Sequence, residues 1–189
     1  DVYKRQDLYY DAPPQPATNP VEVKSWYILL QDTEGNGYDR VVLSESKDVN
    51  QAFASLSVGE WSDTIIQEFK TSKGVMKGAF KCKVLELSRD GSNFKMYVTI
   101  INALEGWSYP ESIALEINSE KGLPCPRDGY VPLLLGWIDH KTFLEVVEFQ
   151  HIWVADAVTY LLKNKEWDLF FMHAHCPDWM YHTFSAVSY

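Results

Sequence analysis

Residues 167–182 read WDLFFMHAHCPDWMYH in one-letter code, and they hold most of what the sequence indicates about fold and chemistry. The first six, Trp167–Met172, are apolar almost without interruption, which is typical of a strand that is buried on both faces. A helical pattern precedes this run, and a helix followed by a buried strand is the order of elements typical of an α/β core. Ligands of open α/β sheets sit at the carboxyl ends of strands, and here three histidines and an aspartate follow that end.

Asp178 and His182 are four residues apart and follow Pro177, a residue that favours the first turn of a helix. Residues at this spacing lie on one helical face, with Cβ atoms about 5–6 Å apart. A carboxylate oxygen and an imidazole nitrogen can then share one divalent cation, each at roughly 2.0–2.2 Å. The pattern predicts Asp178 and His182 as metal ligands, although it also fits a helix-capping aspartate beside a structural histidine.

His173 and His175 are two residues apart on the predicted strand, so their side chains point to the same side. We consider them candidates to line the site or to contact substrate as neighbours of the metal. The alternative is that they cap the strand through hydrogen bonds to the backbone. Cys176 has no Cys/His/Asn arrangement near it in the sequence, so we interpret it as a small apolar residue and not as a nucleophile.

Residues 141–185 are therefore expected to supply a helix, a strand and the metal motif of an α/β core. The helix starts at Thr142 and continues to Leu162, because apolar residues recur at helical spacing throughout. Asp139 stands just before it and is interpreted as a neighbour of the helix cap. The Lys163–Lys165 segment closes the helix with positive charge that suits its dipole.

Residues 23–102 predict a mostly antiparallel β module of five or six strands. Alternating and β-branched stretches separated by Gly/Asn turns place strands at 23–30, 38–43, 64–69, 80–87 and 94–101. Residues 103–140 form an irregular, proline-punctuated connection with a short helix at 111–119. The expected fold class is thus α/β, with the β module inserted into the α/β core.

The ends of the sequence predict that residues 7–185 are an internal fragment of a longer protein. Residues 1–6 and 186–189 resemble translated sequencing adapters and are kept out of fold reasoning. Residues 7–22 hold four prolines and are interpreted as an extended connector.

The composition excludes several function classes. A formal net charge of −9 disfavours nucleic acid, whose phosphates would be repelled. No apolar run approaches the roughly 20 residues of a membrane span. Three widely spaced cysteines without a CxxC pair indicate free thiols in a reducing compartment, so we expect a cytoplasmic protein.

The Asp178/His182 motif behind residues 167–171 resembles the metal motif of the alkaline phosphatase superfamily. Within it, the sequence is most similar to the type I phosphodiesterase/nucleotide pyrophosphatase group and its predicted phosphohydrolase relatives. The 58–62 segment and the helix before Trp167 share this similarity. One departure is Tyr181, since the phosphodiesterase branch often has glycine just before the histidine.

This resemblance implies a phosphate ester hydrolase with an α/β/α core and two divalent metal ions, zinc or manganese. Asp178 and His182 would hold one ion, and the substrate would be a small-molecule phosphate ester. The resemblance places the nucleophile upstream of residue 7 and the second site's Asp-His pair beyond residue 185, so no catalytic residue is expected in this fragment. We therefore expect the 189-residue chain alone to be inactive.

A second hypothesis belongs to a different class of protein. Residues 23–102 would be a β-sandwich binding or interaction module for a carbohydrate or a protein, and the histidines would be structural. The sequence leaves open the substrate, the metal, the choice between phosphatase, phosphodiesterase and phosphomutase, and the oligomeric state.

Overall fold

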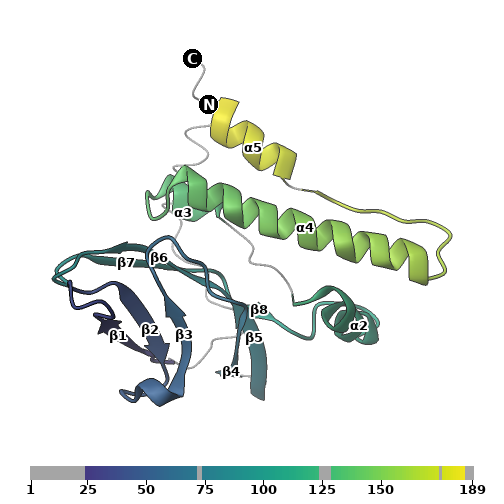
Figure 1. Cartoon of the computed structure of the whole chain (residues 1–189). Helices are drawn as coiled ribbons and strands as arrows, with labels where there is room; N and C mark the ends of the chain where they lie inside the picture. The colour runs from purple at the N-terminus through teal and green to yellow at the C-terminus, as the bar shows by residue number, and fades with distance from the viewer. Residues whose placement is uncertain (1–23, 72–73, 124–128, 175, 186–189) are drawn as a thin grey trace.

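The computed structural model describes residues 24–71, 74–123, 129–174 and 176–185. The chain combines helices with antiparallel sheets, and the long helix α4 lies across the β-rich part (Figure 1). The strands are β1 Tyr27–Gln31, β2 Arg40–Ser44, β3 Ala52–Leu56, β4 Ile65–Thr71, β5 Gly74–Phe80, β6 Cys82–Leu87, β7 Phe94–Val98 and β8 Asn102–Ala103. The helices are α2 Ser112–Lys121, α3 Tyr130–Leu134, α4 His140–Asn164 and α5 Cys176–Phe184, with a 3-10 turn at Val49–Gln51.

In the described part of the chain the strands form three small sheets in the orders β1-β2-β3, β4-β5-β8 and β6-β7, and the pairings between these strands are antiparallel. Single bridges from Val58 and Trp61 to β6 tie the connection between β3 and β4 to the third sheet. Apolar side chains from five of the strands fill one shared core. Its buried members are Val41, Leu43, Leu56, Ile65, Phe69, Phe80, Cys82 and Val84.

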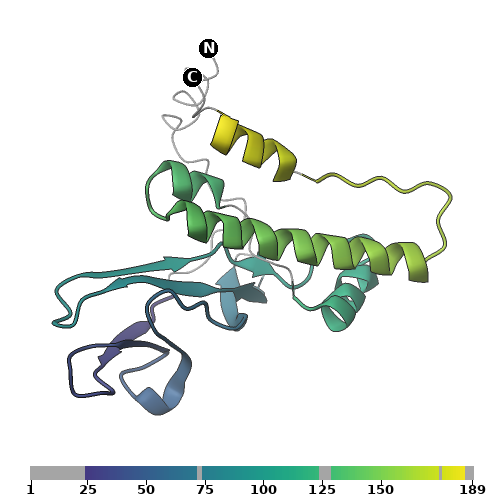
Figure 2. The same cartoon turned by 45° about the horizontal axis from the view of Figure 1, so that its top comes forward.

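The helix α4 packs on the β-rich part mainly through its first two turns. Phe143, Val146 and Val147 are buried there with Tyr97 of β7 and with Ile138. At its other end α4 packs against α2, while α3 lies beside its start (Figures 1 and 2). The helix predicted from Thr142 forms but begins two residues earlier, at His140, because Asp139 is itself the N-cap, and its carboxylate accepts a hydrogen bond from the Thr142 backbone N–H at 2.7 Å.

The predicted buried strand at Trp167–Met172 is wrong in this structure. After α4 the chain returns along the helix as an extended segment without regular secondary structure (Figure 2). Leu169 is 72% and Phe171 85% exposed. No strand among the described residues pairs with this segment, and a strand forms only where a neighbour supplies hydrogen-bond partners for its backbone.

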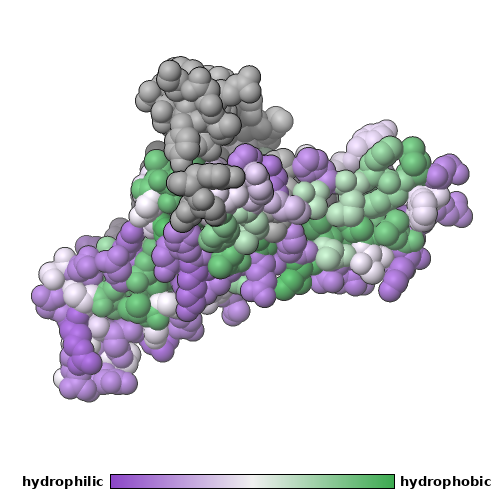
Figure 3. All heavy atoms as spheres, turned by 90° about the horizontal axis from the view of Figure 1, so that it is seen from above, coloured by the Kyte–Doolittle hydropathy of each residue, from purple (hydrophilic) through white to green (hydrophobic). Residues whose placement is uncertain are grey.

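Apolar side chains consequently gather on the surface at the end of the molecule where this segment meets the second half of α4 (Figure 3). The number of strands differs from the predicted five or six, since the described residues of the β-rich part form eight. The strand expected over 80–87 is interrupted at Lys81, so that β5 and β6 belong to different sheets.

No described helix has the length and apolarity to cross a membrane. The predicted adapter-like ends, the connector at 7–22 and His175 lie outside the described residues.

Candidate functional site

The structure brings Asp178 and His182 together on the surface of α5. The helix begins at Cys176, with Pro177 and Asp178 in its first turn, as the sequence predicts. The Asp178 Oδ1 and His182 Nε2 atoms are 3.2 Å apart. Both side chains remain accessible, with exposed fractions of 59% for Asp178 and 44% for His182. The two groups therefore face one another and are open to solvent.

This spacing fits a shared metal ion. Two atoms 3.2 Å apart, each about 2.1 Å from one ion, enclose an angle of about 100° at that ion, which is close to tetrahedral. The same distance also fits an ion pair between the carboxylate and a protonated imidazole. Among the described residues, no group of three or more His, Cys, Asp or Glu side chains could hold a metal. The pair thus offers two ligands, and the others must come from elsewhere.

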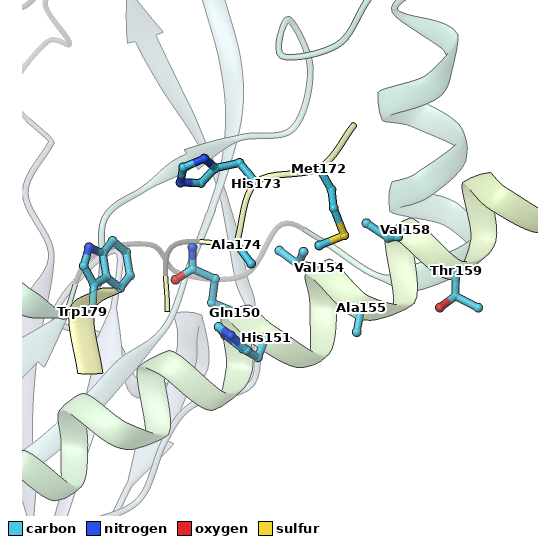
Figure 4. A pocket seen from close by; sticks show the side chains of 10 residues that line it. All are labelled: Gln150, His151, Val154, Ala155, Val158, Thr159, Met172, His173, Ala174 and Trp179. Atoms are coloured by element: carbon cyan, nitrogen blue, oxygen red, sulfur yellow. The ribbon is translucent and has the colours of Figure 1, made fainter. Parts of the chain in front are cut away.

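A groove of about 640 Å³ lies between α4 and the extended segment that precedes α5 (Figure 4), and neither Asp178 nor His182 is among its lining residues. Trp179, the residue after Asp178, forms its end at α5. His173, the other candidate residue that the structure describes, lines this groove from the extended segment. The sequence gives no sign of this groove, because its pattern predicts that residues 167–172 are buried in a sheet.

A second cluster of charged groups, which the sequence did not reveal, joins β6 to α4. Lys83 is only 3% exposed, and its ammonium forms an ion pair with Glu145. Lys83 also donates to the Thr142 hydroxyl at 3.1 Å. Trp61 Nε1 donates to the same Glu145 oxygen at 2.8 Å, and the ammonium lies 5.5 Å from the Trp61 ring centre.

The charge state of Glu145 follows from these contacts. Burial raises the pKa of the Glu145 carboxyl, whereas the hydrogen bonds from Lys83 and Trp61 lower it. The lowering prevails, so the pKa of Glu145 lies below its usual value. Glu145 is therefore ionised at neutral pH and balances the buried ammonium. Since Lys83 and Glu145 pair with each other, we interpret this cluster as structural.

Comparisons of the chain with protein-family models, with curated proteins and with solved structures found no match. The class of protein is therefore described by the fold and the site alone. They define a protein of helices and antiparallel sheets that carries an accessible Asp/His pair on α5 and a groove between α4 and the segment before α5.

Proposed function

We propose that this chain is part of a metal-dependent phosphohydrolase of the alkaline phosphatase superfamily, which hydrolyses a small-molecule phosphate ester or diester. In this proposal Asp178 and His182 hold one of two zinc or manganese ions. The observation that carries it is the 3.2 Å approach of Asp178 Oδ1 to His182 Nε2 on an accessible helical face. Two such ions would supply stabilisation of the negative charge that develops on the phosphoryl oxygens during hydrolysis.

The role of this chain would be to position those two ligands. The helical spacing fixes the carboxylate relative to the imidazole, and Asp178 in the first turn is favoured as an anion by the helix dipole. The nucleophile and the ligands of the second ion are proposed to lie in parts of the protein beyond this sequence. Accordingly, the 189-residue chain is expected to bind metal weakly and to show no phosphatase turnover.

The proposal includes an α/β/α core to which α4 and residues 167–172 belong. Support comes from the exposed apolar side chains of this extended segment, which runs along α4 without a strand neighbour among the described residues. Such a segment fits a strand whose neighbours are supplied by further chain. We also propose a reducing, cytoplasmic location, since the described thiol of Cys82 is buried and free.

The metal pair is tested by following the histidine imidazole signals of the 189-residue chain by NMR while Zn²⁺ is added. The His182 signal is expected to shift first, and Asp178→Asn should weaken that response at least tenfold. Asp168→Asn is the matched control, because it removes an exposed carboxylate ten residues earlier and should leave the response unchanged. Equal zinc affinity of the Asp178→Asn variant would refute the ligand assignment.

The reading frame that surrounds this sequence in its source DNA provides an independent test. The proposal requires an aspartate and a serine or threonine motif upstream and an Asp-His pair downstream. If neither is encoded, the hydrolase proposal fails, and the hypothesis of a β-type interaction module with structural histidines takes its place. Phosphatase turnover by the 189-residue chain alone would also contradict the proposal, because half of the metal ligands would be missing.

A further inference from the structure

The strand β7 lies at the open end of its sheet. Among the residues that the structure describes, its one strand neighbour is β6 (Figure 1). The other side of β6 is taken by the connection between β3 and β4, through the bridges at Val58 and Trp61. No described strand pairs with the other side of β7, so that side is an open edge.

The register of β6 and β7 determines which backbone groups point to this open edge. In an antiparallel pair, residues that hydrogen-bond the partner strand alternate with residues whose N–H and C=O point away from it. The Thr99 N–H donates to the Lys81 carbonyl at 3.0 Å, which puts Tyr97, two residues earlier, in the hydrogen-bonded set as well. Met96 and Val98 take the alternate positions, so their N–H and C=O groups point to the open edge.

The far side of β6 confirms this alternation. The residues opposite Met96 and Val98 are Val84 and Cys82. Their carbonyls accept hydrogen bonds at 2.7 and 2.8 Å from backbone N–H groups of the 58–62 connection, on the side away from β7. Opposite residues of this set point away from one another, so Met96 and Val98 offer their backbone groups on the side away from β6.

A groove of about 460 Å³ follows the open edge of β7. Four consecutive residues of the strand, Lys95–Val98, line it. Their side chains alternate between faces, since Met96 and Val98 pack on the core of the strands and Tyr97 packs with buried residues of α4. A groove reached from both faces of a strand runs along its edge. Its other wall comes from α3 and the turn after it, with Val131, Pro132 and Trp137.

The lining of this groove specifies the chemistry of a ligand. Trp137 is 58% and Ile100 49% exposed, so both have apolar surface to bury. Lys95 is the one charged residue in the described lining, and its Nζ reaches the Gly136 carbonyl at 3.4 Å. Free backbone N–H and C=O groups need hydrogen-bond partners, which an apolar molecule lacks and an extended peptide supplies at matching intervals. Because an edge lysine discourages unselected strands, a peptide with a matching carboxylate is favoured.

We propose that the open edge of β7 binds an extended peptide segment of another protein, which adds a strand to the β6-β7 sheet. Apolar side chains of the peptide pack on Trp137 and Ile100, and an acidic residue pairs with Lys95. A second copy of the chain is less suited, because pairing of two β7 edges would bring two walls of α3 and Trp137 into the same space. This binding is independent of the metal pair at Asp178 and His182.

The proposal is tested by amide hydrogen exchange of the 189-residue chain, followed by NMR. In the free chain the Met96 and Val98 amides should exchange at least tenfold faster than the Tyr97 amide, which faces β6. The probe is a capped hexapeptide with four alternating valine and threonine residues between two glutamates. At saturation it should slow the exchange of Met96 and Val98 at least tenfold.

Two further forms of the probe carry N-methyl groups on alternate residues, one form on each set. Amides of an added strand face β7 at every second residue, so one form should lose binding and the other should keep it.

Substitutions locate the peptide on this edge. Trp137→Ala removes the main apolar wall and should weaken binding at least tenfold, whereas Leu135→Ala, 46% exposed and outside the lining, should not. Lys95→Glu should weaken binding of the probe and strengthen binding of a peptide with terminal lysines in place of the glutamates. Lys77→Glu is its matched control, because it reverses the charge of an exposed lysine on β5. Unchanged amide signals of β1 and β2 show that each variant is folded.

Three results would overturn the proposal. Met96 and Val98 amides as protected as that of Tyr97 at all protein concentrations would mean that the chain covers its own edge. Protection that rises with protein concentration would mean that a second copy pairs there, and equal binding of both N-methylated forms would mean that no strand is added. Asp178→Asn should leave peptide binding unchanged, so this test and the zinc titration of His182 fail independently.

Discussion

Replacement of Glu145 by glutamine tests whether the buried ammonium of Lys83 depends on its counter-charge. Glutamine keeps an oxygen that can accept the hydrogen bond from Trp61, so the substitution removes the negative charge and little else. Breaking a buried ion pair from one side costs about 3–5 kcal/mol, because the remaining charge is left uncompensated. Lys83 has 4% and Glu145 26% of its side chain exposed, so we expect the low end of that range, about 3 kcal/mol.

The assay is urea unfolding of both proteins, followed by tryptophan fluorescence at neutral pH. The double variant Lys83→Met/Glu145→Leu is the control, because replacing both charges with apolar groups of similar volume is often neutral or stabilising. It should recover to within about 1 kcal/mol of the original protein. A loss below about 1 kcal/mol for Glu145→Gln, or a double variant as unstable as the single one, would refute the assignment of a buried pair.

The same pair gives a pH dependence of known sign. The pKa of Glu145 is lower in the folded protein than in the unfolded chain, where it is about 4.3. Ionised Glu145 therefore adds fully to the free energy of unfolding above the unfolded pKa, and this contribution is lost as the pH falls through the folded pKa. The stability difference between the original protein and Glu145→Gln should therefore narrow below about pH 4. A difference that stays constant down to acid unfolding would contradict this.

Three further substitutions or measurements test the packing. Asp139→Ala removes the N-terminal cap of α4 and should cost about 1 kcal/mol in urea unfolding, whereas Asp139→Asn, which can still cap, should cost less. Phe143→Ala, at a fully buried position, should lower the free energy of unfolding by about 3–5 kcal/mol. The neighbouring Leu144 is 41% exposed, so Leu144→Ala should lower it by less than about 1 kcal/mol. Burial raises the pKa of the Cys82 thiol to about 12. In a variant with the other two cysteines replaced by serine, Cys82 should therefore resist a thiol reagent at pH 8 until the protein unfolds. Rapid labelling of the native protein would contradict the burial of Cys82.

Elements that depend on local patterns were predictable from the sequence. The helix expected from Thr142 to Leu162 is α4, and the pairing of Asp178 with His182 follows from helical spacing alone. The strands predicted at 23–30 and 38–43 form as β1 and β2, which pair as antiparallel neighbours, because Gly/Asn turn residues separate two strand-like stretches. In each case the information lies within a few residues of the element that it specifies.

Features that depend on distant residues were not predictable in this way. The alternation over residues 80–87 indicates a strand but gives no sign that Lys83 is buried, because its partner Glu145 is 62 residues away. The apolar run at 167–172 has the composition of a buried strand, yet it stays an exposed segment since no described strand lies beside it. The groove between this segment and α4 could not be foreseen for the same reason.

The tie between Lys83 and Glu145 sets a practical limit on how the protein can be shortened. Excision of the eight described strands as a minimal β protein, by a cut between β8 and α2, would remove the carboxylate that pairs with the Lys83 ammonium and accepts the hydrogen bond of the Trp61 indole. Such a truncation would need Lys83→Met to keep its interior neutral. Protein engineers who retain the native lysine must retain at least the first turns of α4 with it.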